Sequence, residues 1–597
     1  MAGWSGWGLT GDRISLQMRG MRKLVAATLT AALLASTAAG AVSPPAYDVL
    51  IRNAQIYDGS GGAPFQGEVA VAEGRIAYVG PRAPESAKTT IDAQGKAVSP
   101  GFINMLSWAT DSLIADGRGL SDLKQGVTLE VMGEGTSMGP LSPEMKRLEL
   151  QRMGDIKYPI EWTTLDEYLS WLEKRGVAVN VASFIGAATV REHVLGEGDV
   201  DPTPEQLLAM RKLVVEAMED GALGVGSSLI YAPASYAETP ELTALATEAG
   251  RCGGIYISHL RSEADRLLEA IDELIEISRV SGAPAEIYHL KQAGRANWDK
   301  LEPAIAKIEA ARAKGQRITA DMYTYTAGST GLDAAMPPWV QAGGVEQWVA
   351  RMKDPATRAK VIAEMRQEKP SFENLYRHAG AEGTLLVGFK NPALKPLTGK
   401  TLAEVAKARG VSPEEAAIDL VIEDGSRVQV VYFLMSEENV ARQTALPWMS
   451  FGSDASAQAP EGVFLKSSTH PRAYGNFARV LGKYVREEKT TSLPDAIRRL
   501  SALPAQNLGL KDRGLLKVGY HADVVLFDPQ TVGDRGTYEK PQQFATGVSH
   551  VLVNGKLVLA DGEPTGVTAG QVVRGRAWKG WSEGGCKPTA KDWSWAW

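Results

Sequence analysis

Short apolar runs alternate with helical segments across the middle of the chain, and this alternation constrains the fold most. The segments 204–220 and 262–281 repeat apolar residues at three- and four-residue spacing, which is typical of helices. Strands separated by helices form parallel sheets, because parallel neighbours need a long crossover connection. Eight runs are present, the number that closes a (β/α)8 barrel. The runs are 97–106, 126–135, 177–186, 222–231, 253–260, 284–291, 317–326 and 448–456.

Both ends of the chain show short alternating β-type runs instead. Asn554-Gly555 and Asp561-Gly562 on the C-terminal side are typical hairpin turns. We predict that residues 42–98 and 513–575 share one small composite β domain.

The α/β barrel is expected to comprise residues 99–342 and 440–512. The interval 343–439 is too long for one connection and contains its own helical patterns. It therefore predicts an inserted, lid-like subdomain over the site.

The first 41 residues are predicted to be a signal peptide. Residues 21–41 combine Arg22-Lys23, an apolar run and a final Ala39-Gly40-Ala41. The true start is expected at Met18 or Met21, because polar and aromatic residues precede this segment. These features predict an exported protein, periplasmic or secreted, with no membrane span after cleavage.

Composition favours a small-molecule partner. A net charge of -6, spread over 64 basic and 70 acidic residues without a basic block, argues against nucleic-acid binding. Cys252 and Cys586 are too few for a disulfide framework, and Cys252 is expected to be buried. For the Trp-rich tail, residues 576–597, the expected role is packing on the β domain.

Two histidines close neighbouring predicted strands, one βα repeat apart. His259 ends GIYISH and His289 ends AEIYH, so both imidazoles should project at the same barrel rim. Glu134, at the end of TLEVMGE, is the best third ligand for a zinc ion whose fourth position stays open. One Zn²⁺ per chain is predicted. Asp454, which ends the last run, suits a general base that acts on water beside this metal.

The sequence around these residues, from about residue 47 to about residue 566, resembles the N-acyl-D-amino-acid deacylase branch of the amidohydrolase superfamily. The resemblance implies a metal-dependent barrel enzyme that cleaves the amide bond of N-acyl-D-amino acids. Zinc would be held by the residues matching His259 and His289, and the base would match Asp454. The supporting segments are SPGFIN, GALGVGSSLIYAPASYAETPEL, SHLRSEADR, YHLKQAGRANW, DMYTYTAGST, GSDAS, HPRAYGNFARVL and KDRGLLKVGYHADVVLFDP.

The chain departs from that family at its first strand. A His-x-His pair usually follows there, but the matching positions are Leu106 and Trp108, and the preceding Asp is Asn104. The family's loop cysteine is also missing beside Glu134. The remaining ligand set is similar to that of the N-acetylglucosamine-6-phosphate deacetylases, members of the same superfamily that can work with a single zinc.

An N-acyl amino acid carries a free carboxylate, which calls for cations near the rim. Lys291 and Arg472 are the best candidates, with Tyr323 or Tyr325 as a donor to the reacting oxygen. Two alternatives stay open: a related hydrolase of dipeptides, cyclic amides or lactones, and a periplasmic binding protein that has lost hydrolysis.

Overall fold

The computed structural model describes residues 46–586. The predicted signal peptide, residues 1–41, and the tail beyond residue 586 lie outside the described residues.

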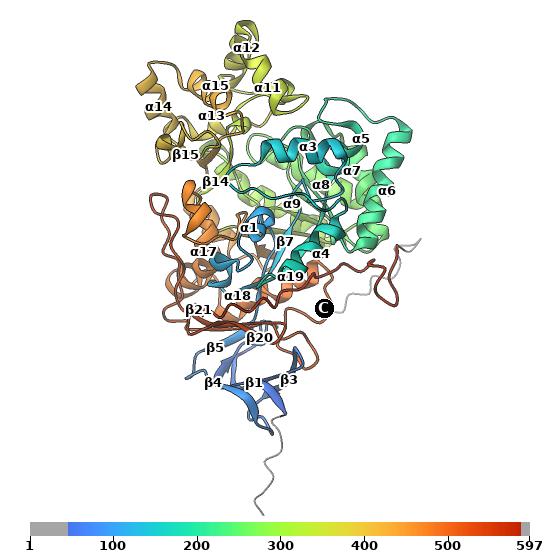
Figure 1. The fold of residues 1–597 in the computed structure, drawn as a ribbon, viewed down its shortest axis with the longest axis vertical. Coiled ribbons are helices and arrows are strands. Elements are labelled where there is room, and N and C mark those ends of the chain that lie inside the picture. Colours follow the sequence, from blue (N-terminus) through green and yellow to red (C-terminus); the bar gives the residue numbers. More distant parts are fainter. Residues whose placement is uncertain (1–45, 587–597) are drawn as a thin grey trace, which may run out of the picture. The chain divides into compact units, whose positions relative to one another are not determined.

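Parallel strands in two hydrogen-bonded sheets, joined to each other by backbone hydrogen bonds at both ends, form the predicted α/β barrel beside its helices (Figure 1). Strands β8 and β9 belong to one predicted run and meet at Phe184, whose N–H donates to Met132 at 2.8 Å. The ring closes where the Met105 N–H donates to Phe451 at 3.2 Å. The strands are β6 (Phe102–Asn104), β7 (Val127–Met132), β8 (Asn180–Ser183), β9 (Ile185–Gly186), β10 (Gly224–Ser228), β11 (Ile255–His259), β12 (Ala285–Ile287), β13 (Ile318–Met322) and β17 (Met449–Phe451).

Helices between the strands follow from local sequence signals. In α6, Thr203 and Gln206 form a capping box around Pro204, and Gly221 ends the helix with a φ of 113°. Its apolar side buries Met210 and Val214. Helices beside the barrel strands include α4 (Leu165–Arg175), α5 (Ala187–Leu195), α6 (Pro204–Asp220), α7 (Thr239–Arg251), α8 (Leu267–Ser281), α9 (Leu301–Ala313), α18 (Leu493–Leu500) and α19 (Ala502–Asn507).

Strands from both chain ends form one mixed sheet, as predicted. The two parts join where β18 pairs antiparallel with β5, with Val524 opposite Pro100. The strands are β1 (Tyr47–Ile56), β2 (Phe65–Ala72), β3 (Arg75–Gly80), β4 (Ala87–Asp92), β5 (Ala97–Pro100), β18 (Val524–Phe527), β19 (Val548–Val553), β20 (Lys556–Ala560) and β21 (Glu563–Pro564).

The segment between β13 and β17 contains a further, three-stranded sheet. Its strand β14 (Ala327–Gly331) precedes residue 343, where we placed the start of the insertion, because it pairs with the distant β16 (Gln429–Phe433). Strand β15 (Thr384–Gly388) completes the sheet. The limits of a subdomain and its role as a lid stay predictions. The helices here are α10 (Pro338–Gln341), α11 (Val345–Met352), α12 (Pro355–Met365), α13 (Leu375–Ala379), α14 (Leu402–Arg409), α15 (Pro413–Asp424) and α16 (Glu437–Gln443).

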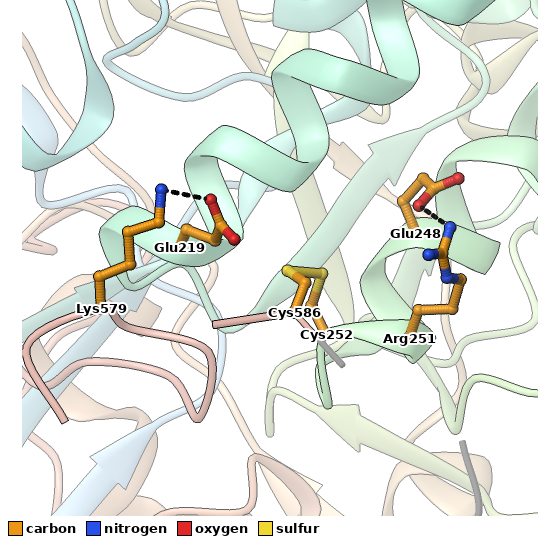
Figure 2. Close-up of a disulfide and its surroundings, with 6 residues drawn as sticks. All are labelled: Glu219, Glu248, Arg251, Cys252, Lys579 and Cys586. Carbon is orange, nitrogen blue, oxygen red and sulfur yellow. Dashed lines mark hydrogen bonds and ion pairs between the residues drawn. A yellow bond between two sulfur atoms is a disulfide. The ribbon is translucent and has the colours of Figure 1, made fainter. Parts of the chain in front are cut away.

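A disulfide joins Cys252 to Cys586, a single bridge that the sequence analysis did not predict, and Cys252 is buried as expected (Figure 2). The described part of the tail contacts the ends of barrel helices: Cys252 follows α7, and Lys579 pairs with Glu219 of α6 at 2.6 Å. A partner 334 positions away in sequence could not be inferred from cysteine spacing. Within residues 46–586, no helix is both long and apolar enough to cross a membrane.

Candidate functional site

The carboxyl ends of the barrel strands border a cavity of about 490 Å³. Glu134, His259, His289 and Asp454 all line it. This is the rim at which a barrel of parallel strands presents side chains from its βα loops.

Glu134, His259 and His289 form a candidate metal-binding triad. One ligand atom from each lies within 4.8 Å of the other two, and all three residues are buried. Oε1 of Glu134 lies 3.1 Å from Nδ1 of His259 and 3.0 Å from Nε2 of His289. Two imidazoles and one carboxylate at this spacing are a donor set that suits zinc.

Backbone conformation fixes the direction of two of these side chains. Gly133 and Gly135 flank Glu134 with φ values of 106° and 70°. A Cβ at Gly135 would lie 2.1 Å from the Ser228 hydroxyl oxygen, so only glycine lets the loop pass there. His289 has a φ of 35°, and its backbone N–H donates to Oδ1 of Asp321 at 2.9 Å. This hydrogen bond supports an uncommon conformation that turns the imidazole toward Glu134.

The triad creates a strong local field. Burial opposes charge on Glu134, but His289 and His259 outweigh it and hold the pKa of that carboxyl well below its usual range. Burial and Lys291 oppose charge on His289, but Glu263 and Glu134 outweigh them and raise its pKa to about 10. The two carboxylates therefore create a negative local potential that favours positive charge on His289.

Glu263 supports the triad from behind, and the sequence analysis missed it. Its Oε1 lies 3.0 Å from Nδ1 of His289, and the Lys291 ammonium donates to the same oxygen at 2.5 Å. A carboxylate on the far nitrogen of a ligand histidine orients the ring and raises its basicity. Glu263 lies in the loop between β11 and α8, four residues after His259, and no periodicity in the sequence indicates that its side chain meets His289.

Asp454 lines the same cavity as the triad. Burial raises its pKa, while the Arg472 guanidinium opposes that rise. Nη1 of Arg472 lies 2.9 Å from Oδ2 of Asp454, and the Trp108 indole N–H donates to Oδ1 at 3.2 Å. Both oxygens of the carboxylate are therefore held in place.

The predicted substrate-binding residues divide into two groups. Lys291, Arg472 and Tyr323 line the cavity, and the Arg472 guanidinium lies 4.5 Å above the Tyr323 ring. The placement of Tyr325 is a correction: its hydroxyl donates to Asp534 at 3.1 Å, and it does not border the cavity in the described residues. Tyr323 and Tyr325 would share a face if the strand continued, but β13 ends at Met322, so strand alternation does not hold here and the turn directs Tyr325 toward Asp534.

The positions of the missing His-x-His pair and its preceding Asp have other partners. Leu106 is fully buried, and a Cβ on Gly452 would lie 2.7 Å from its side chain. Asn104 donates to Glu130 at 2.9 Å and to Ser453 at 2.8 Å. Neither residue belongs to the candidate metal-binding triad.

Comparisons with known proteins decide the family. A model of the amidohydrolase family matches residues 89–559. The chain belongs to the amidohydrolase family. This amidohydrolase is 34% identical over 537 residues to an N-acyl-D-aspartate deacylase of Alcaligenes xylosoxydans xylosoxydans. The aligned region covers 89% of this chain and 96% of that relative.

Solved structures of related enzymes share the fold of this amidohydrolase. N-acyl-D-glutamate deacylase from Bordetella bronchiseptica, in complex with zinc and a phosphonate inhibitor, matches with a TM-score of 0.72 at 29% identity, over 88% of this chain and 99% of that one. A D-aminoacylase matches with a TM-score of 0.74 at 30% identity, over 88% of this chain and 100% of that one. That enzyme has a binuclear metal centre in which one metal activates and the second attenuates. The resemblance predicted from the motifs is confirmed, and the amidohydrolase is a D-aminoacylase-like hydrolase of C–N bonds.

Proposed function

We propose that this amidohydrolase cleaves the amide bond of N-acyl-D-amino acids, with one zinc ion held by Glu134, His259 and His289. The buried convergence of these three side chains beside Asp454 supports the proposal most. The D preference rests on the relatives, which include deacylases of N-acyl-D-aspartate and N-acyl-D-glutamate.

When bound, zinc would polarise the scissile carbonyl and lower the pKa of water toward about 7. The chain's own residues would move the proton. Asp454 would take it from the attacking water and return it to the leaving nitrogen. Burial makes this carboxylate more basic than a surface Asp, and its orientation is kept by an ion pair with Arg472 and a hydrogen bond from Trp108.

The same cavity has a wall suited to the substrate's free carboxylate. Lys291 Nζ lies 5.4 Å and the Arg472 guanidinium 4.5 Å from the centre of the Tyr323 ring, on a buried surface. Nε of Arg472 is buried without a hydrogen-bond partner among the described residues, so it can donate to a ligand. Tyr323 is the proposed donor to the oxygen that gains charge during reaction.

One metal suffices in this proposal. In the related D-aminoacylase one metal activates and a second attenuates. The present chain keeps a three-residue donor set and places Leu106 in a buried apolar cluster.

We also propose that the protein is exported to the periplasm or the medium. The Cys252–Cys586 disulfide supports this, because structural disulfides persist in oxidising compartments. Mass spectrometry of the exported protein tests it, with a mature N-terminus expected near Val42; an intact residue 1–41 segment would contradict it.

The proposal is tested by measuring zinc per chain together with hydrolysis of a panel of N-acetyl-D- and N-acetyl-L-amino acids. Wild type should bind one zinc and cleave D substrates, and His289→Ala should lose both because two ligands hold zinc poorly. His550→Ala, in the β domain, is the matched control and should lose neither. Zinc binding with cleavage only of dipeptides, cyclic amides or lactones would refute the substrate class. Absence of both zinc and hydrolysis would favour the binding-protein alternative.

A further inference from the structure

Trp108 occupies a specific place between the proposed metal ligand and the proposed base. It follows β6, and its indole borders the main cavity and a neighbouring chamber of about 930 Å³. The indole N–H donates to Oε2 of Glu134 at 2.9 Å and to Oδ1 of Asp454 at 3.2 Å. One N–H therefore bridges two carboxylates that belong to different barrel loops.

We propose that Trp108 restricts this site to a single metal by occupying the position of a second, bridging cation. The inference rests on the proposed function. A cation shared by these two oxygens would sit about 2 Å from each. Both oxygens lie within 3.2 Å of the indole nitrogen, so a cation held between them on the indole side would overlap the N–H group.

Trp108 also sets how Glu134 can act as a ligand. The indole engages Oε2, while Oε1 is the oxygen that lies 3.0 and 3.1 Å from the two histidines. The carboxylate thus presents one oxygen to the triad and keeps the other bound to the chain. A neutral donor satisfies the facing oxygens of Glu134 and Asp454 without adding a metal.

The other position of the missing His-x-His pair supplies no side-chain ligand for a second ion. Leu106, two positions earlier, has a fully buried apolar side chain. Arg472 holds the remaining oxygen of Asp454 at 2.9 Å. With the indole removed, Glu134 Oε2 and Asp454 Oδ1 become two free carboxylate oxygens facing the same space.

The test counts zinc per chain by equilibrium dialysis over a range of free zinc, beside hydrolysis of the D substrate. Wild type should stay at one zinc and keep its activity as zinc rises. Trp108→His, which offers a ligand nitrogen, and Trp108→Ala, which only frees the carboxylates, should rise to two zinc ions and lose activity at high zinc.

Trp171→Phe is the matched control, because it also removes an indole bond to a carboxylate, from Trp171 to Glu161 at 2.7 Å on the remote helix α4. It should stay at one zinc. Uptake of a second zinc by wild type at the same free zinc as by Trp108→His would overturn the inference. So would a constant single zinc in both Trp108 variants, although the proposed function would then stand. Wild type without zinc would instead refute the proposed function itself.

Discussion

Replacement of Asp454 by Asn should separate hydrolysis, which needs a base, from zinc binding, which does not. Asp454 has a φ of 49°, a conformation that Asn adopts readily, so the backbone should be preserved. Asn keeps one acceptor oxygen for Trp108 or Arg472 but cannot take a proton from water. Because Asp454 lies outside the triad, the variant should keep its zinc.

The expected loss of activity is about 10²- to 10⁴-fold, the usual contribution of a positioned acid or base. This corresponds to about 3–5 kcal/mol in the activation free energy. Stability should fall less, by roughly 1–3 kcal/mol, because the Arg472 side chain, 3% exposed, loses a charged partner but keeps an acceptor.

The assay combines steady-state hydrolysis, zinc content and urea denaturation. Asp534→Asn is the control, since Asp534 also accepts from an arginine, Arg479 at 3.0 Å, but lies away from the cavity. Asp534→Asn should lower the free energy of unfolding and keep turnover near that of wild type. Near-normal turnover in Asp454→Asn would refute the role of the base, and loss of zinc would show that Asp454 is a ligand.

Three further predictions concern the surroundings of the site. Glu263→Gln should weaken zinc affinity about 10- to 100-fold, measured by chelator competition, because it removes the carboxylate behind His289; unchanged affinity would contradict this. Cys586→Ser should lower the free energy of unfolding by about 2–4 kcal/mol with unchanged turnover, since neither cysteine borders the cavity; equal melting temperatures would refute it. Burial raises the pKa of Glu286 to about 7 from 4.5, so its stabilising contribution is complete below pH 4.5 and is lost as pH rises through 7. Glu286→Gln should remove this pH dependence of the free energy of unfolding, which amounts to roughly 3 kcal/mol at 1.36 kcal/mol per pKa unit. The free energy is measured below pH 4.5 and above pH 7, and the same change with pH in variant and wild type would contradict the prediction.

Local patterns in the sequence determined most of the fold and the centre of the site. A strand and a helix each impose a period on a short stretch of chain, so the eight runs and the helix at 204–220 could be recognised without any partner. His259 and His289 were recognisable because a barrel gathers the ends of its strands at one rim. Glu134 and Asp454 followed from the same rule.

Tertiary structure alone decided which side chains meet across the chain. Glu263 meets Lys291 and His289, and Trp108 bridges Glu134 and Asp454, through loops that the sequence keeps apart. Tyr325 donates a hydrogen bond to Asp534, 209 positions away, and Cys252 forms a disulfide with Cys586, 334 positions away. Periodicity reports only which face of an element a residue occupies; the distance between two side chains depends on how every intervening element packs, and no local pattern encodes it.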